Sequence, residues 1–153
     1  MGAREKDLNP DVYIGLQLPL TYDDDGFFTQ TKTTIKQAQY NIINLLKTIP
    51  GERLGQPLYG SRLHHLLFEP MTEDLSERIQ SEIQKALETW LPYITVNDIK
   101  IAFLGPNANQ VDVSIQFGLS FDPSAMEQVS IDFAQFEEFV GETADVGIAT
   151  TGN

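Results

Sequence analysis

The stretch that divides this chain runs from Thr48 to Ser61 and reads TIPGERLGQPLYGS. Pro50 has no N–H to give to a helix, and Gly51 can take the positive φ that is common at helix ends. Apolar residues at helical spacing lie on both sides of this stretch. The sequence therefore predicts a loop that ends one helix before the next begins.

The interior of this loop is unusually polar and aromatic for a connector. An acid stands beside an arginine (Glu52 and Arg53), and an aromatic residue stands beside a glycine (Tyr59 and Gly60). Such a group is typical of a docking surface, and the planar guanidinium of Arg53 suits a carboxylate or backbone carbonyls. A solvated loop with one local ion pair is the alternative.

Two main helices are predicted around the loop. The first is capped by Thr33 or Thr34 and runs to Lys47, and the second is opened by Thr72 and is ended by Pro92. Between them, Ser61 is expected to cap a short helical turn. Each main helix has one apolar face, formed by Ile35, Ala38, Ile42, Leu45 and Leu46 in the first and by Leu75, Ile79, Ile83, Ala86, Leu87 and Trp90 in the second.

The hydrophobic period changes from 3.6 to 2 after Ile94. Residues 99–103 and 111–119 alternate around a turn at 105–109, and 129–133 offer a third strand. The predicted fold class is α+β: two main helices packed on a small antiparallel sheet, in a single domain. We expect a flexible N-terminal arm over 1–11, the α+β domain over 12–140, and an acidic, disordered tail over 141–153.

Charge and composition limit the classes of function. The chain has 153 residues, no cysteine and a net charge of −12, and all ten Lys and Arg lie in residues 1–100. Nucleic-acid backbones require cationic surface, so direct binding of nucleic acid is not expected. There is neither a signal-peptide core nor a run of about 20 apolar residues, so a soluble protein without membrane contact is expected.

Several motifs together resemble a known family. They are Thr48 to Arg53, Pro57, Tyr59 to Ser61, Leu63 and Leu67 to Pro70, with Ile14 to Leu16, Pro19 and Leu20 upstream and Trp90 to Ile94 downstream. In combination they resemble the baseplate wedge and sheath-initiator family of contractile phage tails. This family, which includes "lysozyme-like" wedge proteins, also has members in type VI secretion baseplates. The resemblance covers roughly residues 12–120. Many members carry Glu-Pro-Arg after the tryptophan where this chain has Leu91-Pro92-Tyr93, so no role of that Glu or Arg is carried over.

The resemblance implies a structural subunit of a virion tail baseplate, made and assembled in the host cytoplasm. Its implied partners are other wedge proteins, the tail sheath protein, and tube or hub proteins. The sheath would be initiated by strand pairing, because an unpaired sheet edge can receive another chain's backbone. We expect this edge at Val111–Leu119 or at Val129–Phe133. The predicted interface residues are Glu52, Arg53, Tyr59, Trp90, Pro92, Tyr93, Val111, Val113, Ser114, Ile115, Phe117, Val129 and Ile131.

Enzymatic and metal-binding functions have weaker support. A peptidoglycan-cleaving glycosidase needs two carboxyl groups, and Glu69 and Glu52 are the candidates. Adjacent helical side chains such as His64 and His65 diverge by about 100°, and the acidic run at 23–25 lacks the spacing of a calcium loop. We therefore predict no catalytic residue, cofactor or metal. An adaptor domain unrelated to tails is a further alternative.

Overall fold

In the computed structural model, residues 7–9, 11–67, 69, 72, 74–104 and 110–133 are described. The helices are α2 (Thr34–Lys47), α3 (Leu63–Leu67) and α4 (Leu75–Trp90). The strands are β1 (Gly15–Leu16), β2 (Gln30–Thr31), β3 (Ile94–Leu104), β4 (Gln110–Leu119) and β5 (Asp122–Asp132). The predicted α+β class is confirmed. The domain boundaries stay predictions, and the expected tail and the turn at 105–109 lie outside the described residues.

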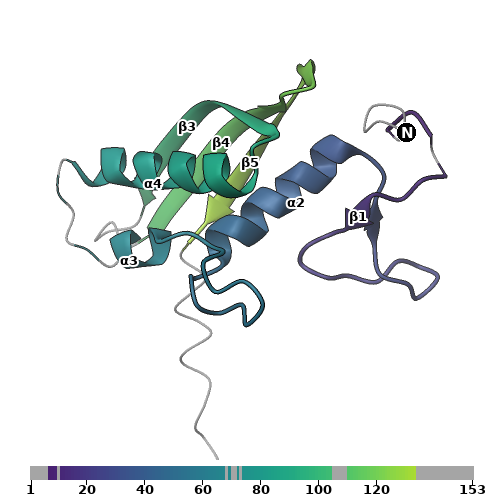
Figure 1. The fold of residues 1–153 in the computed structure, drawn as a ribbon, viewed down its shortest axis with the longest axis horizontal. Helices are drawn as coiled ribbons and strands as arrows, with labels where there is room; N and C mark the ends of the chain where they lie inside the picture. Colours follow the sequence, from purple (N-terminus) through teal and green to yellow (C-terminus); the bar gives the residue numbers. More distant parts are fainter. Residues whose placement is uncertain are drawn as a thin grey trace, which may run out of the picture.

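The main sheet is an antiparallel meander in the order β3-β4-β5 (Figure 1). Its register places Ile115 opposite Ile99 on one side and opposite Val129 on the other. Because side chains alternate along a strand, the odd-numbered apolar residues of β4 all lie on the face that the helices cover. The third strand begins at Asp122 rather than at residue 129, so the β4–β5 connection is shorter than expected.

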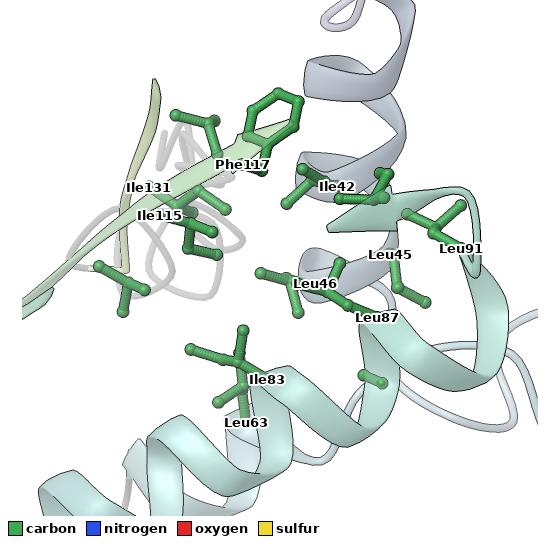
Figure 2. Packing of buried hydrophobic residues seen from close by; sticks show 14 of the residues in the cluster. Ile42, Leu45, Leu46, Leu63, Ile83, Leu87, Leu91, Ile115, Phe117 and Ile131 are labelled. Atoms are coloured by element: carbon green, nitrogen blue, oxygen red, sulfur yellow. The ribbon is translucent and has the colours of Figure 1, made fainter. Parts of the chain in front are cut away.

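The two main helices cover one face of this sheet, as predicted. α4 packs on β3 while α2 packs on β5 and on α4. Figure 2 shows the core between the layers, where Phe117 and Ile115 of the sheet face Ile42 of α2. Burying one such side chain contributes about 1.5–3 kcal/mol. The net stability of a domain is only about 5–15 kcal/mol, which a few such side chains already match. Burial of apolar side chains in this core is therefore the main contribution that holds the helices on the sheet.

The caps of the helices differ from the sequence-based expectation. Thr33 is the N-cap residue of α2 but makes no side-chain cap bond. Instead Asp7 Oδ1 accepts hydrogen bonds from the Thr34 N–H at 2.8 Å and from the Thr34 hydroxyl at 2.7 Å. Helix α4 begins at Leu75 rather than at Thr72, although the Leu75 N–H still donates to the Thr72 carbonyl.

Residues 12–31 form a separate hairpin, here called the N-terminal hairpin, beside the start of α2 (Figure 1). Strands β1 and β2 pair within it, and its outer part continues through a bridge between Tyr22 and Phe28. The acidic run at 23–25 forms its tip, where Asp23 Oδ1 accepts the N–H groups of Asp25 and Phe27. The pairing of β1 with β2 was not predicted.

Candidate functional site: the loop between α2 and α3 and the edges of the sheet

The loop from Thr48 to Ser61 is closed by hydrogen bonds between its ends. The Ser61 N–H donates to the Thr48 carbonyl at 3.0 Å, and the Ser61 hydroxyl donates to the Leu46 carbonyl at 2.9 Å. Ser61 therefore closes the loop onto the end of α2, and its hydroxyl makes this bond instead of the predicted cap of the next helix. Within the loop, the Gly51 N–H donates to the Pro57 carbonyl at 2.7 Å. These bonds give the loop a fixed shape.

Two glycines let the chain reverse direction in this loop. Gly51 has a φ of +104° and Gly60 has a φ of +127°, a region that residues with a Cβ rarely adopt. At Gly60 space is also lacking, because a Cβ would overlap the Thr48 carbonyl oxygen and lie 3.1 Å from the Pro50 nitrogen. At Gly51 nothing lies within 4 Å of a built Cβ. The loop closure therefore requires glycine at residue 60 for two reasons.

Arg53, Tyr59 and Trp90 form a stack that joins the loop to the end of α4. The Arg53 guanidinium carbon lies 3.9 Å from the centre of the Tyr59 ring. The Tyr59 and Trp90 ring centres are 5.2 Å apart at 62°, an edge-to-face arrangement. Arg53 thus stacks on an aromatic face, and no carboxylate of the described residues forms an ion pair with it. The expected contact with a carboxylate or with backbone carbonyls stays a prediction for a partner protein.

Burial sets the ionisation of the central ring in this stack. Tyr59 is only 9% exposed, and this desolvation raises its pKa above the usual 10.0. The charge of Arg53 acts in the opposite direction, and Tyr93 adds a smaller increase. A phenol with the ordinary pKa of 10.0 is already neutral at physiological pH, and burial adds to this preference. A buried neutral phenol and a stacked cation support a structural role for this pair.

Other predicted interface residues lie around the stack. Glu52 Oε2 accepts the Ile49 N–H at 3.0 Å and so braces the loop. The Tyr93 hydroxyl accepts a hydrogen bond from the Asn41 amide at 2.8 Å, which ties the end of α4 to α2. Pro92 is exposed, whereas Trp90 and Tyr93 are half-buried.

The outer surface of the loop is apolar at two positions that the sequence analysis did not single out. Leu54 is fully exposed and Leu58 is 79% exposed. They follow Arg53 and precede Tyr59, so the stack and these leucines belong to one short, rigid segment. Exposed apolar side chains on a fixed loop are typical of a contact surface for another protein.

The strand order corrects one of the two predicted docking edges. β4 is the central strand and pairs with both neighbours, so Val111–Leu119 has no free edge. Its predicted interface side chains are core residues as well. Those of Val111, Val113, Ile115 and Phe117, together with Val129 and Ile131 of β5, are at most 6% exposed.

The outer edge of β5 has backbone groups that point away from the sheet. The Phe133 N–H donates to the Val111 carbonyl at 3.1 Å. In an antiparallel ladder, hydrogen-bonded pairs alternate with non-bonded pairs, so residues 129 and 131 bond to β4. Ser130 and Gln128 therefore direct their N–H and C=O groups away from β4, and the Gln128 carbonyl is 3.5 Å from the Gln39 amide of α2.

The same alternation applies to the rest of the sheet. The backbone groups of Ser114 point toward β3, inside the ladder. On the outer side of β3, the Ile99 carbonyl already accepts the Gln80 amide of α4 at 3.0 Å. The available candidates for docking are thus the outer edges of β5 and β3, of which only β5 was predicted.

The carboxylates proposed for catalysis are engaged structurally. Arg78 binds both oxygens of Glu69 in an open cleft between α3 and α4. This contact raises the pKa of Arg78 above its usual range. Among the described residues, no group of three His, Asp or Glu side chains is placed to hold a metal ion. None of the described helices has both the length and the apolar run needed to cross a membrane.

The fold defines a class of protein: a small α+β domain with a three-stranded meander under two helices. Residues 32–124 match the model of the family described as baseplate wedge protein gp25, and the chain belongs to this family. Membership supports a place in the baseplate of a contractile tail, with other baseplate components as partners.

Solved structures show the same fold at low sequence identity. A subunit of the anti-feeding prophage baseplate is 22% identical, with a TM-score of 0.60 over 71% of this chain and 86% of that one. A "putative tail lysozyme" from Geobacter sulfurreducens is 18% identical, with a TM-score of 0.60 over 67% of this chain and 92% of that one. A comparison with curated protein sequences gives no match.

Proposed function

We propose that this chain is a structural subunit of a tail-baseplate wedge that joins wedge proteins near the tube and initiates sheath assembly. Two surfaces carry these roles: the loop with Arg53, Leu54 and Leu58 binds wedge proteins, and the β5 edge receives a sheath strand. The observation that carries the proposal is the pair of outward backbone groups at Ser130 and Gln128, within a family of baseplate proteins. Tube or hub proteins are further partners of the assembled wedge.

The charge of the β5 edge favours a basic strand as the one that docks there. Asp122, Glu127 and Asp132 lie on β5, and the chain has no lysine or arginine after Lys100. Lys36 of α2 pairs with Glu127 at 3.1 Å, and the residues of β5 itself carry acids and no base. Two copies of such an edge repel each other, whereas a strand with Lys or Arg is attracted.

A structural role explains the carboxylates better than glycoside hydrolysis does. A glycosidase needs one carboxyl group held protonated in an apolar pocket. The Glu69 side chain is 38% exposed and both of its oxygens are held by the Arg78 guanidinium, so it does not lie in an apolar pocket. Glu52 braces a backbone N–H of its own loop. The likeness to the protein described as a tail lysozyme is at 18% identity and bears on the fold alone.

Proline substitution at the β5 edge tests the strand-pairing role. Ser130→Pro removes an N–H that points away from β4, so we expect the domain to fold and sheath nucleation on baseplates to fall at least tenfold. Ser114→Pro is the matched control for fold damage: it removes an N–H inside the ladder and should unfold the domain. The readout is sheath length and number by electron microscopy. Normal sheath on baseplates that carry folded Ser130→Pro protein would show that the β5 edge is not the docking site.

A further inference from the structure

The N-terminal hairpin exposes more large apolar side chains than any other described segment of its length. Tyr22 and Phe27 are each 69% exposed, and all residues from 19 to 28 are exposed. The exposed apolar side chains of the hairpin are those of Tyr13, Leu16, Leu20, Tyr22, Phe27 and Phe28. Scattered single apolar residues are ordinary on a protein surface, but a run of aromatic residues on one projecting hairpin indicates an interaction surface.

The hairpin is attached to the domain by polar contacts rather than through the core. None of its apolar side chains belongs to the core cluster of the described residues. Its base is held by the Thr31 hydroxyl and the Gln37 amide oxygen, which are 2.5 Å apart, and Lys32 lies 5.3 Å above the Tyr13 ring. Folding of the domain therefore does not account for these apolar residues.

The shape of the hairpin is nevertheless ordered before any partner binds. The Thr29 N–H donates to the Thr21 carbonyl at 2.8 Å, and their hydroxyls lie 3.0 Å apart. The Tyr22 and Phe28 rings stack at 5.0 Å between centres. Asp23 fixes the tip by accepting two backbone N–H groups. A preorganised apolar surface loses little conformational entropy on binding.

The charge of the hairpin indicates which partners can bind to its apolar surface. The hairpin carries Asp23, Asp24 and Asp25 and no lysine or arginine over residues 12–31. A second copy would bring the same three carboxylates, and residues 134–153 of the chain carry four acids and no base. Both occupants that the chain itself could supply are thus repelled, and so is an anionic lipid surface.

We propose that the N-terminal hairpin is a separate docking arm that inserts its aromatic side chains into an apolar groove of another protein, with lysine or arginine on the rim. The aromatic residues provide the buried contact, and Asp24 and Asp25 at the tip face the basic rim. This surface is distinct from the loop at 48–61 and from the β5 edge. The inference rests on the proposed function only in taking its partner from the same tail particle.

Photo-crosslinking in assembled particles tests this arm directly. A benzoyl-phenylalanine in place of Phe27 should cross-link to one peptide of another baseplate protein, with apolar residues next to Lys or Arg. The same photoreactive residue in place of Phe121, an exposed aromatic residue at the β4–β5 turn, is the control and should not label that peptide.

A charge reversal tests the basic rim. Asp24→Lys with Asp25→Lys leaves the Asp23 hydrogen bonds of the tip in place and should lower the cross-link yield roughly tenfold. Glu77→Lys with Glu88→Lys on α4 changes the net charge equally and should leave the yield within about twofold. An unchanged yield after the reversal at the tip would overturn the proposal.

The remaining outcomes also decide the matter. If the chain is present in the particle, four results would overturn the proposal of a docking arm. These are cross-links to a second copy, cross-links to residues 134–153, cross-links to the peptide that the Phe121 probe labels, and no cross-link at all. Absence of the unmodified chain from particles would overturn the proposed function as well. The purified chain can also be tested for binding to phosphatidylcholine–phosphatidylglycerol vesicles. Binding that is abolished by Phe27→Ser would show that the hairpin binds lipid and would contradict the proposal.

Discussion

Gly60 combines a positive φ with a backbone contact that leaves no room for a Cβ. Gly60→Ala should therefore lower the free energy of unfolding by about 2–3 kcal/mol, because both strain and overlap oppose it. Gly51→Ala meets strain but no overlap and should lower the free energy of unfolding by about 1 kcal/mol. Gly55→Ala meets neither strain nor overlap and should change this free energy by less than about 0.5 kcal/mol. Urea denaturation measures the series. Equal losses at residues 60 and 55 would contradict the closed loop.

Arg53 is expected to matter more for assembly than for stability of the isolated chain. Its stack on Tyr59 is worth about 0.5–1 kcal/mol at a partly exposed site, so Arg53→Ala should fold nearly as well as the unmodified chain. Binding of wedge proteins should weaken about tenfold, and Arg53→Lys should not restore it because an ammonium lacks the planar stack. Arg62→Ala is the control, with binding measured by sedimentation. Unchanged binding in Arg53→Ala would exclude the loop as the wedge contact.

At the scale of single residues, the sequence identified Arg53 and Tyr59 but not their contact. The motif drew attention to both residues, and a carboxylate is the usual partner of a guanidinium. The actual partner is an aromatic ring, which stacks on Trp90 from a helix 31 positions further along the chain. Neither periodicity nor spacing predicts such a tertiary contact. Leu54 and Leu58 give no periodic signal in a loop and were missed for this reason.

Among the elements, α2 depends on a cap that comes from outside its own sequence. Asp7 accepts two hydrogen bonds from Thr34, so Asp7→Ala should lower the free energy of unfolding by about 1 kcal/mol. Asp11→Ala removes an exposed acid nearby and should cost less than about 0.5 kcal/mol. Thermal unfolding followed by circular dichroism compares the two. Equal midpoints would show that Asp7 does not cap the helix in solution.

The sequence predicted where the strands lie along the chain, but not which strand lies at the edge of the sheet. Alternating residues from 99 to 133 indicate which face of each strand is buried, and these faces are confirmed. Alternation contains no information on which backbone edge is free. Short connections favour pairing of consecutive strands, which makes the middle strand, Val111–Leu119, internal to the sheet. The Asp25-Gly26 pair is likewise a hairpin signal, but no hairpin was predicted from it.

At the scale of the whole molecule, the prediction of two helices on one face of a small antiparallel sheet is confirmed, because long amphipathic segments have one dominant period. The position of the N-terminal hairpin could not be predicted. Its attachment is polar and local to Thr31, Gln37 and Lys32, and no apolar pattern links it to the core. The molecule therefore presents three separate surfaces: the hairpin, the loop at 48–61 and the β5 edge.

A cryo-electron microscopy map of the assembled contractile particle, at a resolution that shows strands, tests the central claim most directly. The account predicts this chain in the baseplate, with a strand of a sheath subunit hydrogen-bonded to the outer edge of β5 beside Ser130. A chain that is absent from the baseplate, or a β5 edge left bare in particles with a complete sheath, would contradict it.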